Sequence, residues 1–495
     1  MKYKYLYWLT PIVLFFAQAY FTLVSRGQIR YEEYQYKEVY WFAHHLVWDP
    51  LGAGDLGFYG TMYVFNNIFG FSLFGFKIFR LALDAASLLC LSLLLKKLLG
   101  EKRAIIPLVT IGLSPTILFF NTMQVPYGID LQYLPIILYC MLVRPKKKLL
   151  GYLATFASGF LTMLAWLSYA TFVFYLPVLF LFVILGTTRG RTPESRFWMR
   201  SFHSLTRMTM VSLMGFLLPF VAHVLWIYNR DQLIDPATGI GLFRGSGSFQ
   251  ASTENFYQGL KDIVINLFVK ADSYHYEVAE VDFSYVLPAI AILFCVVFSI
   301  KQAAKHKEIK PYVLLCLLLG VSNIIITCLT ESSFNGFRRN TPLIAALYGF
   351  FLIAWYIVGK WKMENGKWKI WGTALLSILL VHHIIAYPLN IAGLKVPSPF
   401  MEYSWFETKT TPFASFMYYQ QKLRAGDLHL NCQEKHVDEY MCNYTDLYAA
   451  LVSDCFWNNT LCHTIYGYLP QYKQYKKLTI GVLSAYDHEK ELPRN

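Results

Sequence analysis

Long apolar segments alternate along the chain with short segments rich in Lys and Arg. An α-helix rises about 1.5 Å per residue and the hydrocarbon core of a bilayer is about 30 Å thick, so a long apolar run predicts a membrane-spanning helix. The pattern predicts an all-α polytopic membrane protein of about eleven transmembrane helices. The runs are Tyr5–Val24, Phe79–Leu95, Ala104–Phe120, Ile129–Val143, two between Leu149 and Thr187 that divide near Ser168, Met208–Tyr228, Tyr285–Ile300, Pro311–Thr327, Leu343–Val358 and Ile370–Ala386.

Basic residues follow every second run, and Lys2 and Lys4 begin the pattern. Cytoplasmic loops retain an excess of Lys and Arg, so the alternation predicts a cytoplasmic N-terminus, an odd number of helices and a C-terminus outside. The clusters after the second, fourth, sixth, eighth and tenth runs are Lys96, Lys97, Lys102 and Arg103; Arg144, Lys146, Lys147 and Lys148; Arg189, Arg191, Arg196, Arg200 and Arg207; Lys301, Lys305, Lys307 and Lys310; and Lys360, Lys362, Lys367 and Lys369.

Composition supports a bilayer environment. The chain is 56% hydrophobic and 15% charged, whereas soluble domains carry roughly 25% charged residues. The net charge of +13 lies largely in the predicted cytoplasmic loops, so no nucleic-acid partner is expected. At the N-terminus, Ala17-Gln18-Ala19 imitates a signal-peptidase site, but the apolar run continues to Val24, which favours a retained helix.

The outward loops are unequal. The first runs from Ser25 to about Ile78, and we expect Tyr31–Val47 within it to be a helix lying at the interface. The fourth, about Asn229–Ser284, contains an apolar stripe at helical spacing, for which packing, membrane contact and covering a site remain open. The stripe consists of Leu260, Ile263, Val264, Leu267 and Phe268.

About a hundred residues follow the last run, which divides the chain into a membrane module, residues 1–390, and an extracytoplasmic tail, residues 391–495. An even set of cysteines in an oxidising compartment predicts two disulfides of undetermined pairing. A zinc cluster with His429, His436 or His463 is the alternative. The tail cysteines are Cys432, Cys442, Cys455 and Cys462.

Two acidic features stand at predicted membrane boundaries. Glu32 and Glu33 follow the first run directly, where a carboxylate can act as a general base or cap an interfacial helix. Asp130 opens the fourth run, and an acid beginning an apolar helix indicates either a functional role or a helix cap.

Several short motifs occur in a definite order relative to these spans. They are Glu32-Glu33 with Tyr34 or Tyr36, Phe69-Gly70-Phe71-Ser72, Arg80-Leu81, Ser114-Pro115 before Phe119-Phe120, Asp130, and Arg338 four residues before Pro342. Together they resemble the GT-C superfamily of polyprenyl-phosphate-sugar-dependent glycosyltransferases, nearest the protein O-mannosyltransferase and lipid A aminoarabinose transferase branch. The resemblance covers roughly residues 1–390, and no single motif in it is specific.

The resemblance implies a GT-C-like helical bundle with interfacial helices in its outward loops. It also implies an inverting transfer of a sugar from a polyprenyl-phosphate donor to a lipid, glycan or protein acceptor. Glu32, or otherwise Glu33, is then the base, and Asp130 orients the base or the acceptor. The expected contacts to the donor phosphate are Arg338 and Arg339, with Lys270 and Arg244 behind them, and the expected sugar or acceptor contacts are Asp49 and Asp55.

The chain also departs from the family pattern. Glu32 replaces the usual Asp, Gly57-Phe58-Tyr59-Gly60 stands where Pro-Pro is common, and Asn340 replaces an aromatic residue after Arg338. A divalent cation is left open as a cofactor, because some relatives bind one. The adjacent His44 and His45 point in different directions on a helix and do not form a dense ligand set.

The resulting hypothesis is a glycosyltransferase whose partners are the donor, its acceptor and membrane lipids, with a bacterial plasma membrane favoured over the endoplasmic reticulum. The alternatives are a ligase or polymerase of lipid-linked polysaccharide, a transporter or flippase, and a scaffold without activity. A transporter needs polar groups deep in several helices, and Asp84 is the clearest of these.

Overall fold

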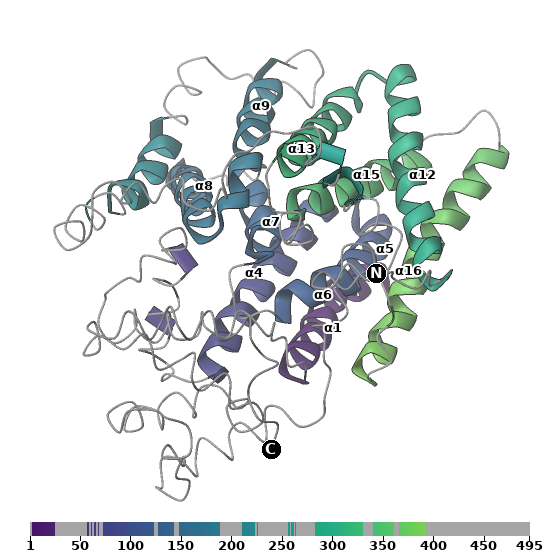
Figure 1. Cartoon of the computed structure of the whole chain (residues 1–495), viewed down its shortest axis with the longest axis horizontal. Coiled ribbons are helices and arrows are strands. Elements are labelled where there is room, and N and C mark those ends of the chain that lie inside the picture. Colours follow the sequence, from purple (N-terminus) through teal and green to yellow (C-terminus); the bar gives the residue numbers. More distant parts are fainter. Residues whose placement is uncertain are drawn as a thin grey trace, which may run out of the picture.

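The computed structural model describes residues 2–24, 57–58, 61, 64–65, 68, 73–122, 127–142, 148–188, 210–222, 225, 256–257, 259–261, 263, 283–329, 340–360, 366–392 and 396. Within these residues every regular element is a helix, and the helices pack into one bundle (Figure 1). The predicted all-α fold is confirmed.

Each predicted run coincides with helix. The elements are α1 Lys2–Val24, α4 Leu73–Leu99, α5 Glu101–Gly112, α6 Pro115–Thr122, α7 Ile129–Leu142, α8 Lys148–Ser168, the 3-10 helix η2 Ala170–Phe174, α9 Tyr175–Thr188, α12 Phe283–Lys305, α13 Lys310–Leu329, α15 Thr341–Lys360 and α16 Gly366–Ile391, with a further helical stretch over 210–222.

Not every helix satisfies a strict criterion for a membrane span. By length and composition, four described stretches do so alone, namely Ile78–Leu99, Leu149–Ser168, Val286–Lys305 and Thr341–Gly359, and the bent pair α5–α6 would make a fifth. The chain is therefore a multi-pass integral membrane protein, while the count of about eleven helices stays a prediction.

One end of the bundle gathers the residues predicted to face the cytoplasm. Near the start of α1, the Tyr7 hydroxyl donates to the Ser92 carbonyl near the end of α4. The Lys97 ammonium donates to the Leu142 carbonyl at the end of α7 at 2.7 Å. The Trp355 indole, near the end of α15, donates to the carbonyl of Arg103 at 2.8 Å. The basic clusters on α4 and α5 thus share one end, as the alternating topology requires.

The third predicted span is not a single helix. The sequence predicted one helix over Ala104–Phe120, but α5 and α6 meet at a bend of 54°. The physical reason is Pro115, which has no backbone N–H to donate and whose ring disfavours a continuing helix.

Side chains from α1 and α16 supply hydrogen bonds at this break. The amide nitrogen of Gln18 donates to the Gly112 carbonyl at 2.8 Å. His383 Nδ1 lies 2.6 Å from the Thr110 carbonyl, and since a carbonyl only accepts, Nδ1 carries the proton. Backbone groups inside a bilayer need partners within the protein, and these two side chains provide them.

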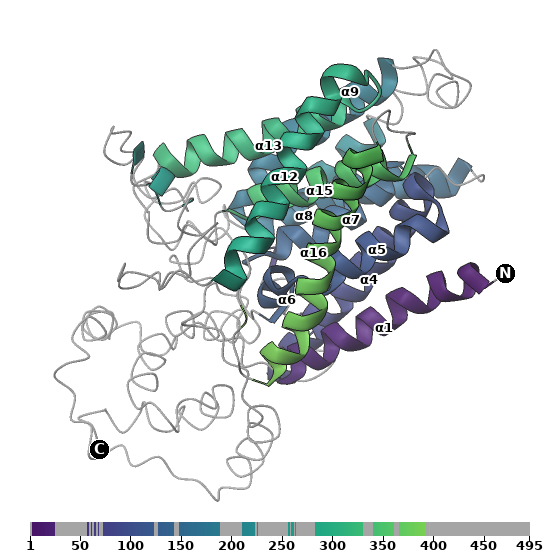
Figure 2. The same ribbon diagram turned by 90° about the vertical axis from the view of Figure 1, so that its right-hand side faces the viewer.

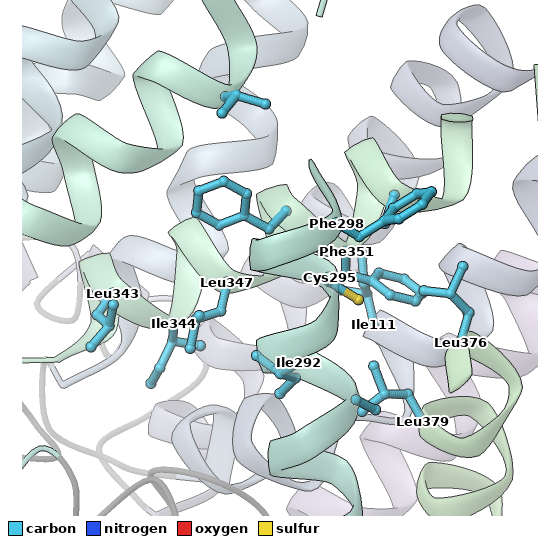
Figure 3. Packing of buried hydrophobic residues seen from close by; sticks show 14 of the residues in the cluster. Ile111, Ile292, Cys295, Phe298, Leu343, Ile344, Leu347, Phe351, Leu376 and Leu379 are labelled. Carbon is cyan, nitrogen blue, oxygen red and sulfur yellow. The ribbon is translucent and has the colours of Figure 1, made fainter. Parts of the chain in front are cut away.

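An apolar core among the described residues includes side chains of α5, α12, α15 and α16. Figure 3 shows side chains of these helices converging, with Cys295 and Phe298 of α12 close to Phe351 of α15. α1 joins the bundle beside α16, and the two helices approach each other toward their C-terminal ends (Figure 2), where the Tyr387 hydroxyl donates to the Ala17 carbonyl at 2.8 Å.

Glycines allow two close approaches elsewhere. A Cβ on Gly159 of α8 would lie 1.8 Å from the Ser212 carbonyl oxygen, so α8 and the stretch 210–222 cross in backbone contact. A Cβ on Gly259 would lie 2.6 Å from the Cα of Cys328, and Ile263 is buried in the core. Packing therefore explains Ile263 of the fourth-loop stripe, whereas Leu260 is 39% exposed. Val264, Leu267 and Phe268 lie outside the described residues.

Candidate active site

Asp130 is fully buried in the first turn of α7, where the N-terminal ends of three helices meet. Its Oδ2 accepts a hydrogen bond from the hydroxyl of Tyr175, the first residue of α9, at 3.0 Å. The same oxygen accepts a second bond from the hydroxyl of Thr341, the first residue of α15, at 2.6 Å. One carboxylate oxygen thus joins segments that are 45 and 211 residues away in the chain.

The other carboxylate oxygen is not engaged in this way. Asp130 Oδ1 has no hydrogen-bond partner among the residues that the structure describes. The backbone N–H groups of Asp130 and Leu131 favour the carboxylate electrostatically, but that of Leu131 is donated to the Gly128 carbonyl at 3.1 Å. Asp130 therefore has one oxygen that accepts two hydrogen bonds and one oxygen without a hydrogen-bond partner among the described residues.

Asn340 lies directly before α15 and is fully buried. Its carbonyl accepts the first backbone bond of the helix, from the Ile344 N–H at 2.9 Å. Asn is a preferred residue at this position because its side chain can also cap the helix. Here, within the described residues, neither side-chain atom, Oδ1 or Nδ2, has a partner.

A second buried polar network lies two residues further along α7. Arg80 of α4, only 1% exposed, donates from one guanidinium nitrogen to Gln132 Oε1 at 2.7 Å and from the other to the Tyr127 carbonyl at 2.9 Å. Gln132 in turn donates through Nε2 to Asp84 Oδ1. Gln132 thereby bridges the positive and negative charges of α4.

Arg80 also ties together residues from two predicted outward loops. Its guanidinium carbon lies 5.6 Å from the centroid of the Phe58 ring, in the first loop, and its bond to Tyr127 reaches the second loop. Next to Phe58, a Cβ on Gly57 would lie 2.5 Å from the Leu164 carbonyl oxygen near the end of α8. The short segment 57–58 thus packs against both α4 and α8.

Gly128 shapes the turn that leads into α7. Its φ of +69° lies in the left-handed region, and a Cβ there would lie 2.4 Å from the Cβ of Phe120. Any other residue would be strained at this position. The turn that positions Tyr127 and Asp130 therefore requires glycine at position 128.

Of the residues predicted for the site, the structure describes Asp130 alone. Its carboxylate connects helices α7, α9 and α15, and its functional role stays a prediction. The other predicted residues lie outside the described residues: Glu32, Glu33, Asp49, Asp55, Arg244, Lys270, Arg338 and Arg339, and likewise His44, His45 and the four tail cysteines. In the part of the chain that is described, no three His, Cys, Asp or Glu side chains gather as metal ligands.

The partners of these groups were missed from the sequence. Tyr175 and Thr341 open apolar helices and look like ordinary boundary residues. Gln132 stands two residues after Asp130, and only its position within an apolar run marked it as unusual. Arg80 was noted as part of a motif, without its contacts.

The chain has structural similarity to solved membrane enzymes but no match in sequence. No family model matches the chain, and no curated protein matches it in sequence. A crystal structure of ArnT from Cupriavidus metallidurans bound to undecaprenyl phosphate is similar with a TM-score of 0.48 at 13% identity, covering 99% of this chain and 78% of that one. The apo form of the same enzyme gives 0.45 at 12% identity, covering 98% and 77%.

The archaeal oligosaccharyltransferase AglB from Archaeoglobus fulgidus, in complex with an inhibitory peptide and a dolichol-phosphate, gives a TM-score of 0.47 at 10% identity. That similarity covers 90% of this chain and 64% of AglB. At TM-scores below 0.5 and identities of 10–13%, similarities of this size do not establish membership of a family.

Proposed function

We propose that this chain is a membrane glycosyltransferase that moves a sugar from a polyprenyl-phosphate carrier to an acceptor on the extracytoplasmic face. The single observation behind the proposal is the buried Asp130 carboxylate at the point where α7, α9 and α15 begin. An acidic side chain within apolar helices is costly and is usually retained for function. The order of the motifs in residues 1–390 resembles GT-C enzymes, and this resemblance is the reason for proposing glycosyl transfer.

The sidedness of the bundle supports an outward site. α7, α9 and α15 all begin at the end opposite the basic residues Lys96, Lys97 and Arg103. Because Lys and Arg are retained on the cytoplasmic side, the Asp130 end is assigned to the extracytoplasmic side.

The covalent connection to Asn340 limits the distance of the predicted phosphate contacts, Arg338 and Arg339, from this site. Arg338 and Arg339 precede Asn340 directly in the sequence. Three residues of chain span at most about 11 Å between Cα atoms, so Arg338 stays within that reach of Thr341, which is bonded to Asp130. In the proposed reaction, these arginines stabilise the negative charge that gathers on the leaving phosphate.

The remaining roles follow the family resemblance. Glu32, or otherwise Glu33, takes the proton of the acceptor as it attacks the anomeric carbon, and the bond from that carbon to the phosphate oxygen breaks. Asp130 orients the base or the acceptor. Lys270 and Arg244 are secondary phosphate contacts, and Asp49 and Asp55 are proposed contacts to sugar or acceptor hydroxyls.

The contacts of Asp84 weaken the transporter alternative. Asp84, the deepest acid predicted from the sequence, is engaged by Gln132, which also accepts from Arg80. This network packs α4 against α7, which favours a structural role for Asp84.

The test is transfer of a radiolabelled sugar from undecaprenyl-phosphate-sugar in membranes that contain wild type, Glu32→Gln or Glu33→Gln. Loss of the general base should lower the rate by about 10²–10⁴-fold in one of the two variants. The control is Glu101→Gln, whose carboxylate pairs with Lys96 at 2.7 Å at the opposite end of the bundle and should leave the rate unchanged.

Full activity in both variants would show that neither glutamate is the base. Translocation of the lipid-linked sugar by reconstituted wild type, with no transfer in any acceptor preparation, would replace the proposal with the transporter alternative.

A further inference from the structure

Four buried polar atoms without partners lie on elements that meet at Asp130. They are Asp130 Oδ1, Asn340 Oδ1 and Nδ2, and the Thr171 hydroxyl, and none of the four has a hydrogen-bond partner among the described residues. Asp130 and Asn340 are fully buried, and Thr171 is 7% exposed.

Short links along the chain connect these atoms. Asn340 adjoins Thr341, and Thr171 on η2 lies four residues before Tyr175, and both Thr341 and Tyr175 bond to Asp130 Oδ2. η2 packs against α15, and α15 packs against α7. A buried polar atom left unpaired destabilises the folded protein, so a group of them on converging elements indicates a ligand that supplies the missing bonds.

The chemistry of the four atoms identifies the class of ligand. The Asp130 and Asn340 oxygens accept, the Asn340 nitrogen donates, and the Thr171 hydroxyl does either. A sugar hydroxyl also both donates and accepts, so neighbouring hydroxyls on one ring can satisfy all of these groups together.

Two other ligands fit less well. A phosphate offers mainly acceptors and would be repelled by the adjacent Asp130 carboxylate. A divalent cation takes about six oxygen ligands, whereas this group holds three oxygens, only one of them charged, beside an amide nitrogen that cannot coordinate.

We infer that Asp130, Asn340 and Thr171 form a subsite that binds neighbouring hydroxyls of the sugar carried by the donor lipid. The inference rests on the proposed function and assigns Asn340 as the residue that distinguishes a glycosylated carrier from the bare lipid phosphate. Asn340 is a departure of this chain from the family pattern, which makes the subsite a property of this protein.

Equilibrium binding to the full-length protein in nanodiscs tests the assignment. The ligands are undecaprenyl phosphate and its glucosyl and mannosyl esters, and the proteins are wild type, Asn340→Ala and Asn340→Ser. Serine is a favoured residue at the start of a helix, so it keeps the test valid if the alanine variant folds poorly. Asn323→Ala, which removes a buried amide from α13, is the matched control.

Wild type should bind at least one glycosyl ester about tenfold more tightly than undecaprenyl phosphate. Both Asn340 variants should lose this advantage, a change of about 1.4 kcal/mol, while their affinity for undecaprenyl phosphate changes less than about twofold. Asn323→Ala should keep the wild-type advantage.

Two results would overturn the inference and leave the proposed function standing: an undiminished advantage in both Asn340 variants, or an equal loss of affinity for all three lipids. If wild type binds none of the three lipids, the proposed function fails as well.

Discussion

The two polar networks of α7 are separated by one residue and differ in how completely they are satisfied. In the Arg80 network, both terminal guanidinium nitrogens and both amide atoms of Gln132 are bonded, and Asp84 Oδ2 is its one atom without a described partner. In the Asp130 network, one carboxylate oxygen, both amide atoms of Asn340 and the Thr171 hydroxyl lack described partners.

This difference separates a structural role from a binding role. Opposite charges that are bridged by an amide hold α4 against α7 and satisfy most of their hydrogen bonds within the protein. Each unpaired group in the second network costs about 1–3 kcal/mol, a cost that selection tolerates where a ligand restores the bonds. We expect substitutions in the first network to change stability and those in the second to change activity.

The largest effect is expected for Arg80→Met. Gln132 and Tyr127 would lose their donor and Asp84 would remain buried without a compensating charge, so the free energy of unfolding should fall by about 3–5 kcal/mol. Unfolding equilibria in bicelles measure this. Lys96→Met, which breaks a partly exposed ion pair with Glu101, should cost less than about 1 kcal/mol, and a similar loss in both variants would contradict the assignment.

Asp130→Asn should have the opposite profile. The amide oxygen can still accept from Tyr175 and Thr341, so the free energy of unfolding should change little. Sugar transfer should fall by about 100-fold, since small displacements of an orienting group are costly in rate. Steady-state kinetics in membranes would show this, and an unfolding defect as large as that of Arg80→Met would remove the contrast between the networks.

Asp84→Asn in the Arg80→Met background tests the structural role of the Arg80 network. Neutralising the stranded acid should restore about 1–2 kcal/mol of the lost stability, because groups in one network are coupled. The same unfolding measurement on the two single variants and the double variant completes the cycle. Strict additivity would mean that Arg80 and Asp84 act independently.

The smallest effects are expected from Tyr175→Phe and Thr341→Val, each of which removes one of the two bonds to Asp130 Oδ2. Each should lower the transfer rate about fivefold, corresponding to about 1 kcal/mol for one hydrogen bond. If Tyr175→Phe abolished transfer with the fold intact, the tyrosine would have a direct part in the reaction.

Much of the fold could be predicted from the sequence, because apolar periodicity and length are local properties. The division of residues 149–187 near Ser168 is an example: α8 ends at that residue and η2 follows. The bend between α5 and α6 was missed, although Ser114-Pro115 was noted as a motif, because hydropathy does not register the missing N–H of proline.

The site could be predicted only in part. Asp130 stood out as an acid at the start of an apolar run, which is a local signal. Its partners Tyr175 and Thr341 come from 45 and 211 residues away, and their pairing depends on how α7, α9 and α15 pack. The bridge of Gln132 between Arg80 and Asp84 likewise arises from packing between α4 and α7, for which the one-dimensional pattern has no equivalent.

The break between α5 and α6 has a consequence for biogenesis. The Thr110 carbonyl, in the third span to be synthesised, accepts a bond from His383, which the ribosome delivers more than 250 residues later. Until α16 has been inserted, that carbonyl has to be hydrated or held by the insertion machinery, so the third span can reach its final form only after the last helix has joined the bundle.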